Sequence, residues 1–261
     1  MEGVEQVFWW HYALMLIAGL AAGVVNTLAG SGSVFTLSVL LFVGLPANIA
    51  NGTNRLGVIF QNIVGVANFR NAGYFKSSDT LTFIVPALIG ALAGAWVAAD
   101  INKEQLEWII GTVMLIMLPI IIFDPKKKLK IEALPERKRG VWSWLIFIAI
   151  GFYGGFIQAG IGIFILFAMI MMARVNLVRA NAVKLLMVLV FAVPVLLVFV
   201  YFGQVMWGYA SVLAVGQVIG AYFASKFAIN HPKSGIWIRR LLIIMIIVTV
   251  GKMFRLYEYF M

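Results

Sequence analysis

Two cations lie inside apolar stretches of this chain, and they are the residues best suited to binding a charged ligand. Arg55 follows Asn51, and Lys184 follows Asn181, about one turn further along a predicted helix in each case. A cation within a membrane helix is energetically expensive and is treated by default as functional. One cation from each half of the chain predicts a paired positive site for an anion. The alternative is that both side chains snorkel to the lipid headgroups.

Two glycine-rich breaks interrupt the apolar sequence at corresponding positions, residues 29–33 (AGSGS) and residues 159–162 (AGIG). Unpaired backbone groups cost several kcal/mol each in lipid, so such breaks survive only where protein or a wet cavity covers them. Paired breaks in two halves point to the binding site of a transporter. Helices beginning after Gly32 and Gly162 would present N–H groups and a positive dipole end to an anion. The alternative is close helix packing through small residues.

Amides and hydroxyls surround the first break, and they can donate hydrogen bonds to anionic oxygens without carrying a full charge. Asn26 precedes the first break, and Gln158 takes the equivalent place before the second. This equivalence favours a ligand contact for these two residues, although single hydroxyls more often bond neighbouring helices. The predicted substrate-binding residues are Asn26, Gly30, Ser31, Gly32, Ser33, Asn51, Asn54, Arg55, Gln158, Gly160, Gly162, Asn181 and Lys184.

Acidic residues are nearly absent from the apolar segments: Asp79, Asp100, Glu104 and Glu107 all lie at segment ends. Carboxylates are the usual cation ligands and proton relays in a bilayer, so their placement argues against a cation channel or pump. The chain has no cysteine and no His-Glu-x-x-His motif, and both histidines lie near segment ends. We therefore predict no catalytic residue, no metal site and no cofactor, and we expect that the protein is not an enzyme.

The elements that must position these residues are membrane helices. Hydrophobic residues make up 63% of the chain and charged residues 11%, whereas soluble domains contain about 25% charged residues. The composition predicts an all-α polytopic membrane protein. Two of the apolar segments, those after the breaks, are too short to span a hydrocarbon core of about 30 Å. The predicted segments are 8–29, 33–45, 49–69, 80–99, 105–123, 141–159, 161–173, 177–202, 205–228 and 236–256.

The chain also repeats itself. Residues 19–26 align with residues 151–158, and the similarity continues through the breaks and the Ala-Asn pairs at an offset of about 130 residues. This self-similarity predicts two repeats of about five helical segments each. We assign the first repeat to residues 1–123 and the second to residues 141–261, with a linker at residues 124–140.

The basic residues of this chain, whose net charge is +10, cluster in short loops between apolar segments. The positive-inside rule places the linker and the loops 70–79 and 226–240 in the cytoplasm. That placement requires an odd number of crossings in each half, so the broken first segment must be a hairpin that spans twice or re-enters. The repeats are then inverted, and both termini lie outside. Inverted repeats are typical of secondary transporters; the alternative is a duplicated structural protein.

Three stretches together resemble the TauE/SafE family, the sulfite exporter family of membrane transporters. They are residues 19–33 (GLAAGVVNTLAGSGS), residues 50–55 (ANGTNR) and residues 154–162 (GGFIQAGIG). With the duplicated layout, the resemblance covers nearly the whole chain. It implies movement of sulfite, thiosulfate, sulfoacetate or other sulfonates. The second half has Val183-Lys184-Leu185 in place of the Thr-Asn-Arg signature, which argues against strict functional symmetry between the halves.

The predicted function is a secondary transporter that moves a small sulfur oxyanion or organosulfonate across a bacterial-type inner membrane by alternating access. The alternative is an anion channel that uses the same residues without alternating gates. The expected partners are the small anionic substrate and the lipid bilayer. The clustering of the basic residues in membrane loops gives no basis for a nucleic-acid partner, and the sequence does not specify the oligomeric state.

Overall fold

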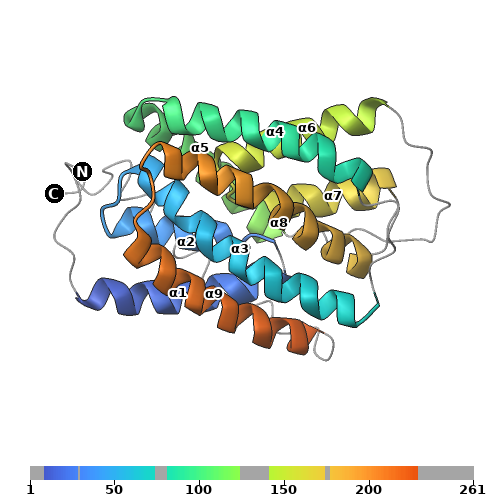
Figure 1. Ribbon diagram of the computed structural model, residues 1–261, viewed down its shortest axis with the longest axis horizontal. Helices are drawn as coiled ribbons and strands as arrows, with labels where there is room; N and C mark the ends of the chain where they lie inside the picture. The colour runs from blue at the N-terminus through green and yellow to red at the C-terminus, as the bar shows by residue number, and fades with distance from the viewer. Residues whose placement is uncertain (1–8, 29, 74–80, 124–140, 174–176, 229–261) are drawn as a thin grey trace.

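The computed structural model describes residues 9–28, 30–73, 81–123, 141–173 and 177–228, and within these ranges the chain is helical with no strand. The predicted linker and the predicted segment 236–256 lie outside the described residues. The described helices are α1 (Trp9–Leu28), α2 (Gly32–Phe42), α3 (Ala47–Asn71), α4 (Leu81–Asp100), α5 (Lys103–Phe123), α6 (Val141–Phe156), α7 (Ile161–Ala173), α8 (Leu177–Tyr201) and α9 (Trp207–Ala228) (Figure 1). They agree with the first nine predicted segments to within a few residues.

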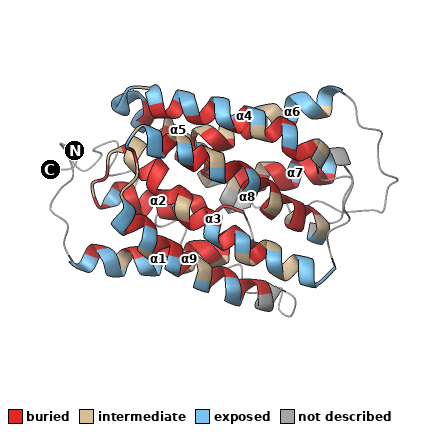
Figure 2. Cartoon of the chain, viewed as in Figure 1, coloured by how far each residue is buried: buried red, intermediate tan, exposed pale blue. Residues whose placement is uncertain are grey.

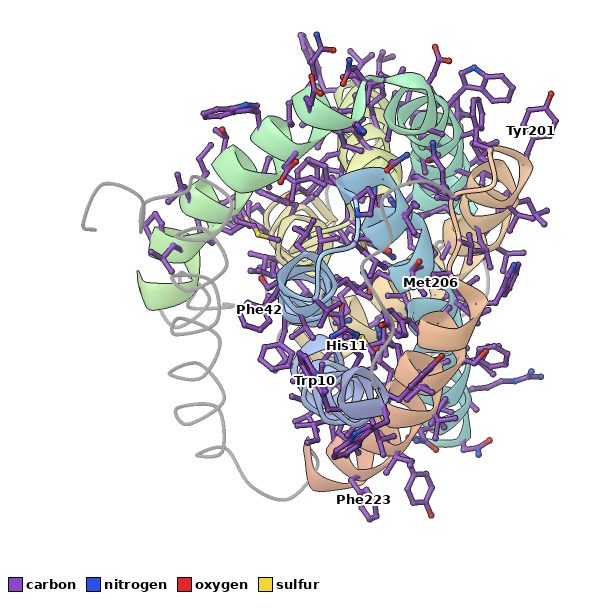
Figure 3. All side chains as sticks on the ribbon, turned by 90° about the vertical axis from the view of Figure 1, so that its left-hand side faces the viewer. Trp10, His11, Phe42, Tyr201, Met206 and Phe223 are labelled. Atoms are coloured by element: carbon purple, nitrogen blue, oxygen red, sulfur yellow. The ribbon has the colours of Figure 1, made fainter. Side chains whose placement is uncertain are left out.

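The outer surface of the helix bundle is apolar. Among the described helices, four are long and apolar enough to cross a membrane, namely α1, α4, α8 and α9. Exposed residues line the outer helices while the centre of the bundle is buried (Figure 2). Large side chains such as Tyr201 and Phe223 project outward from the bundle (Figure 3). Lipid is the solvent that accommodates such a surface, and the chain is therefore an all-α polytopic membrane protein, as predicted.

At both glycine-rich breaks the chain turns back, so that α2 packs on α1 and α7 packs on α6. A Cβ atom added to Gly32 would lie 2.2 Å from the carbonyl oxygen of Ala22, so α2 folds back along α1. At the second break, a Cβ on Gly154 would lie 2.5 Å from Cδ1 of Ile161. With 11 residues in α2 and 13 in α7, these helices are about 16 and 20 Å long. Neither length spans a hydrocarbon core of about 30 Å.

The two halves of the chain interlock. The first helix of each half packs against the fourth helix of the other, α1 on α9 and α6 on α4, and α3 packs on α8 at the centre. Glycines permit the close approach. A Cβ atom added to Gly19 would lie 2.5 Å from the carbonyl oxygen of Leu213, and one added to Gly151 would lie 2.0 Å from that of Ala87. In Figure 1, α1 runs from left to right and α6 from right to left. The packing of one half therefore depends on the other.

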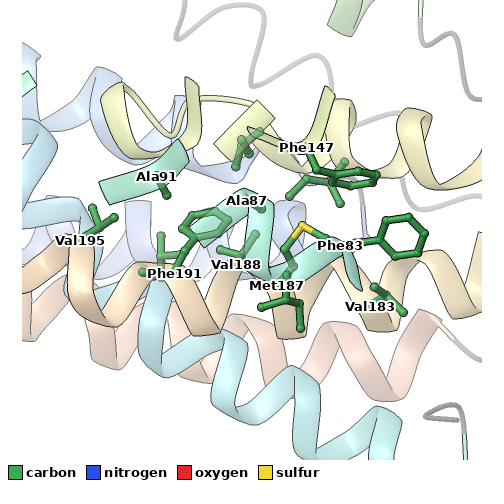
Figure 4. Packing of buried hydrophobic residues seen from close by; sticks show 14 of the residues in the cluster. Phe83, Ala87, Ala91, Phe147, Val183, Met187, Val188, Phe191 and Val195 are labelled. Carbon is green, nitrogen blue, oxygen red and sulfur yellow. The ribbon is translucent and has the colours of Figure 1, made fainter. Parts of the chain in front are cut away.

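Buried apolar residues form two clusters. The first lies around α1, α2 and α5, and the second joins α4, α6, α7 and α8. Figure 4 shows the second cluster, in which Phe83 and Phe147 pack with Met187 and Phe191. These clusters flank the predicted substrate-binding residues.

We expect that single cysteines placed at Ala72 and at Gln105 will be labelled from opposite faces of the membrane. Both positions are exposed, Ala72 directly after α3 and Gln105 in the first turn of α5, and α4 separates them. The natural chain has no cysteine, so each variant carries one labelling site. The measurement is labelling of intact cells by a membrane-impermeant maleimide, with lysed cells as the control. Equal labelling of both variants in intact cells would exclude the crossing by α4.

Candidate functional site

The structure gathers the predicted site residues in the interior of the bundle. All are buried except Asn181, which is half-buried. They come from the end of α1, the first break, the start of α2, the first three turns of α3 and α8, and the second break. The exposed fractions of Arg55 and Lys184 are 0% and 2%, so neither side chain reaches the lipid headgroups. This burial excludes the snorkelling alternative.

The two breaks touch each other through their backbones. Gly30 has φ +79°, a left-handed conformation that glycine adopts without a steric penalty. A Cβ on Gly162 would lie 2.5 Å from the Cα of Gly30, and a Cβ on Gly30 would lie 2.8 Å from the Cα of Gly162. Side chains at either position are therefore excluded. An anion can enter between the breaks only if the two backbones separate.

Asn26 holds the first hairpin together. Its Oδ1 accepts a hydrogen bond from the backbone N–H of Ser33 at 3.2 Å, and its Nδ2 donates to the Oγ of Ser33 at 3.3 Å. The first turn of α2 thus receives its cap from the last turns of α1, which satisfies a helix N–H that has no partner within the helix. In this conformation the Ser33 N–H is engaged by Asn26.

Arg55 binds the C-terminal end of α6, a helix of the other half. Its Nη1 donates to the carbonyl oxygen of Gly154 at 2.7 Å, and its Nη2 donates to that of Gly155 at 2.7 Å and to Oδ1 of Asn51 at 3.0 Å. The Nδ2 of Asn51 donates to the carbonyl oxygen of Phe156 at 2.6 Å. The last carbonyls of a helix lack partners within the helix and form the negative end of its dipole. Asn51 and Arg55 together cap that end.

Lys184 and Asn181 make the reciprocal arrangement at the C-terminal end of α1. The Nζ of Lys184 donates to the carbonyl oxygen of Asn26 at 3.0 Å and to Oδ1 of Asn181 at 2.6 Å. The Nδ2 of Asn181 donates to the carbonyl oxygen of Thr27 at 3.1 Å. Each half therefore supplies one Asn and one cation that cap the broken first helix of the other half.

The electrostatic balance of this centre is positive. Among the residues that the structure describes, no Asp or Glu is buried, and Asp100, Glu104 and Glu107 are exposed. The C-terminal end of a helix carries a partial charge of about −0.5, less than the full charge of one cation. Each cap therefore leaves part of the positive charge uncompensated in a low-dielectric interior. Such a centre attracts an anion.

The backbone of Gln158 is strained, and its side-chain amide has no hydrogen-bond partner. Its φ is 60°, the one left-handed non-glycine conformation among the described residues, and its side chain is fully buried. Neither Nε2 nor Oε1 of its amide has a partner, and the Nε of Arg55 also has none. An unsatisfied buried group costs about 1–3 kcal/mol. Both groups adjoin the end of α6, so they offer unused donors beside the breaks.

Thr36 and Phe199 contact predicted site residues, although neither was predicted to bind substrate. Thr36 donates to Oδ1 of Asn54 at 2.5 Å, and the guanidinium carbon of Arg55 lies 5.2 Å from the ring centroid of Phe199. Outside the site, Gln61 on α3 and Gln217 on α9 are buried amides that the prediction did not include. The sequence signal that could have found both glutamines is a polar side chain inside an apolar helix.

Comparison with known proteins adds an independent result. The family described as Sulfite exporter TauE/SafE matches residues 15–253. The "Probable membrane transporter protein YfcA" of Escherichia coli is 26% identical over 92% of this chain and 88% of its own length. The "Probable membrane transporter protein ORF9" of a Sinorhizobium species is 25% identical over 83% of this chain and 82% of its own length. No solved structure matches the chain.

We expect Gly30→Ala to destabilise the protein more than Gly73→Ala. Both glycines have a left-handed φ, +79° and +76°, so both variants incur a similar backbone strain of about 1 kcal/mol. Only the methyl group at position 30 meets another backbone, that of Gly162, whereas position 73 has open space around it. The measurement is thermal unfolding of purified protein in detergent. Equal losses of stability would show that the breaks are not tightly packed.

Proposed function

The chain belongs to the Sulfite exporter TauE/SafE family and is a multi-pass membrane transporter, and we propose that it carries a sulfur oxyanion or an organosulfonate across the inner membrane. The substrate would be of the sulfite, thiosulfate or sulfoacetate type. One observation carries this proposal: a buried cation from each half lies at the centre, and no carboxylate is buried with them in the described part of the chain.

The chemistry of the two cations suits such a substrate. A guanidinium presents planar donors that match two oxygens of a sulfonate or sulfite, and an ammonium supplies a compact second charge. Charge-assisted hydrogen bonds to anionic oxygens are stronger than those to neutral carbonyls. The anion would therefore compete with the carbonyls of α1 and α6 for Arg55 and Lys184. Asn26, Asn51, Asn54, Gln158 and Asn181 would supply neutral donors around it.

We propose alternating access between two inverted repeats as the mechanism. The opposite directions of α1 and α6 and the equivalent packing of α1 on α9 and of α6 on α4 support it. Substrate bound at the centre would loosen one cap or the other and so change which interface opens. The contact between Gly30 and Gly162 favours this carrier over an open channel. An inside-negative potential favours export by about 2.3 kcal/mol per charge per 100 mV.

Counterflow in proteoliposomes tests the transport proposal. Vesicles loaded with unlabelled sulfite, thiosulfate or sulfoacetate would be diluted into the same radiolabelled anion. A carrier accumulates label transiently and its flux saturates, whereas a channel does neither. Failure to accumulate any of the three anions would overturn the proposed substrate class.

Substitution of the cations should weaken substrate binding. We expect Arg55→Gln and Lys184→Gln each to lose about 1–3 kcal/mol of binding free energy, the scale of a hydrogen bond to a charged group. This loss corresponds to a roughly tenfold to hundredfold rise in Kd. Arg55→Lys should also be impaired. A planar guanidinium can contact Gly154, Gly155 and an anion at once, whereas a compact ammonium cannot. Calorimetry on purified protein measures the change.

The matched control for these variants is Arg70→Gln, which removes an exposed cation from the same helix, α3. It should bind the anion like the wild type. Because Arg55 caps α6, size-exclusion chromatography must show that each variant is folded before its affinity is compared. Wild-type affinity in folded Arg55→Gln and Lys184→Gln would remove both residues from the site.

Replacing Gln158 with glycine should separate stability from binding. Glycine adopts the φ of 60° without a steric penalty, and the change also removes an amide that has no partner. We therefore expect Gln158→Gly to unfold at the same temperature as the wild type or a higher one, yet to bind the anion about tenfold more weakly. A variant that is less stable and binds normally would assign Gln158 a structural role.

A further inference from the structure

A second set of buried amides lies outside the central site, on α3 and α9. Gln217 on α9 is fully buried, and neither its Nε2 nor its Oε1 has a hydrogen-bond partner. Gln61 on α3 has an exposed fraction of 2%, and its Oε1 has no partner. The two helices pack along each other. Three amide atoms of these two residues are therefore buried without partners.

The side chain of Gln217 reaches across the interface to the backbone of α3. A Cβ atom added to Gly57 would lie 2.5 Å from its Nε2 and 2.7 Å from its Cδ, so the absence of a side chain at Gly57 makes room for this amide. Gln61 follows Gly57 by one turn of α3, and Asn54 of the central site precedes Gly57 by about one turn. The amides thus continue the polar face of α3 away from Arg55.

The polar face extends to the C-terminal end of α3. There the Nδ2 of Asn68 donates to the Oγ of Ser225 on α9 at 2.5 Å. From Asn54 to Asn68, this track of polar residues on α3 and α9 covers about 20 Å along the helix axis. These residues extend from the turn beside Arg55 towards the C-terminal end of α3.

The corresponding interface in the other half, between α8 and α4, has no such polarity. At the repeat offset, Met187 replaces Gly57, Phe191 replaces Gln61, and Ala87 replaces Gln217. All three are buried in the apolar cluster of Figure 4. The same helix pair can therefore pack without amides, and an unsatisfied buried amide costs about 1–3 kcal/mol. Packing alone gives no reason for the glutamines.

We propose that the interface of α3 and α9 is the route of the substrate between the central site and the C-terminal end of α3, with Gln61 and Gln217 as a neutral anion-binding station on it. This inference rests on the proposed transport of a small oxyanion. Amide N–H groups donate to anionic oxygens, and because they carry no charge they hold the anion more weakly than Arg55 and Lys184. A weak intermediate station allows an ion to leave a charged site.

Gln217→Met and Gln61→Met test the route. Methionine has a similar length and removes the amide. We expect the Kd for sulfite at the central site to stay within about threefold of the wild type, and the counterflow rate of radiolabelled sulfite to fall at least about tenfold. The unfolding temperature should be unchanged or raised, because an unpaired buried amide is lost.

The matched control is Gln204→Met, which removes a buried amide that has a partner, since its Nε2 donates to the carbonyl oxygen of Ala99 at 2.7 Å. This variant should lose stability and retain the transport rate per folded molecule. A wild-type rate in both Gln61→Met and Gln217→Met would overturn the route, as would a rate that falls only in proportion to stability. Absence of counterflow in the wild type itself would instead overturn the proposed function and this inference with it.

Discussion

The structure depends on one constraint, which is that backbone carbonyls at the end of a broken helix must find donors where lipid offers none. Helices α1 and α6 end inside the bundle, at residues 28 and 156. Their last carbonyls face Lys184 and Arg55, with Asn181 and Asn51 beside them. The carbonyls need donors, and the cations need negative partners, because neither is tolerated alone in an apolar interior. Each group makes the burial of the other possible.

This pairing ties the two halves into one unit. Each cation caps a helix of the opposite half, and the glycine contacts between α1 and α9 and between α4 and α6 bring those helices within reach. The contacts that hold the fold are therefore also the contacts of the candidate site. A ligand that binds the cations must change the interface between the halves, because the same donors serve both. Such a shared set of donors couples binding to conformation.

The halves are alike in packing and different in polarity. Arg55 corresponds to Leu185, and the cation of the second half, Lys184, is one position earlier. Further along the same helices, the amide of Gln61 corresponds to the ring of Phe191. Different side chains at corresponding positions can leave helix packing intact while they change what an interface offers to a solute. In this protein the interface of α3 and α9 carries the polar groups, and that of α4 and α8 forms apolar core.

The sequence by itself determined the class of protein, the helices and the positions of the breaks. It did so because lipid admits few backbone solutions, so that apolar segments must be helices and a Gly-rich interruption such as residues 29–33 must be covered. It also made Arg55 and Lys184 candidate site residues, since a cation in an apolar run is rare, and the structure buries both. The family resemblance seen in residues 19–33 and 50–55 agrees with the match over residues 15–253.

Only the tertiary structure decided which groups meet. That Arg55 caps α6, that Asn26 caps α2 while its counterpart Gln158 stays unpaired, and that Gln217 fills the space at Gly57 all depend on contacts between distant segments. Hydropathy and periodicity describe one helix at a time, and they carry no information on which carbonyl a buried donor will face. Those partners are fixed by the crossing of helices from the two halves, and close packing of glycine against backbone sets that crossing.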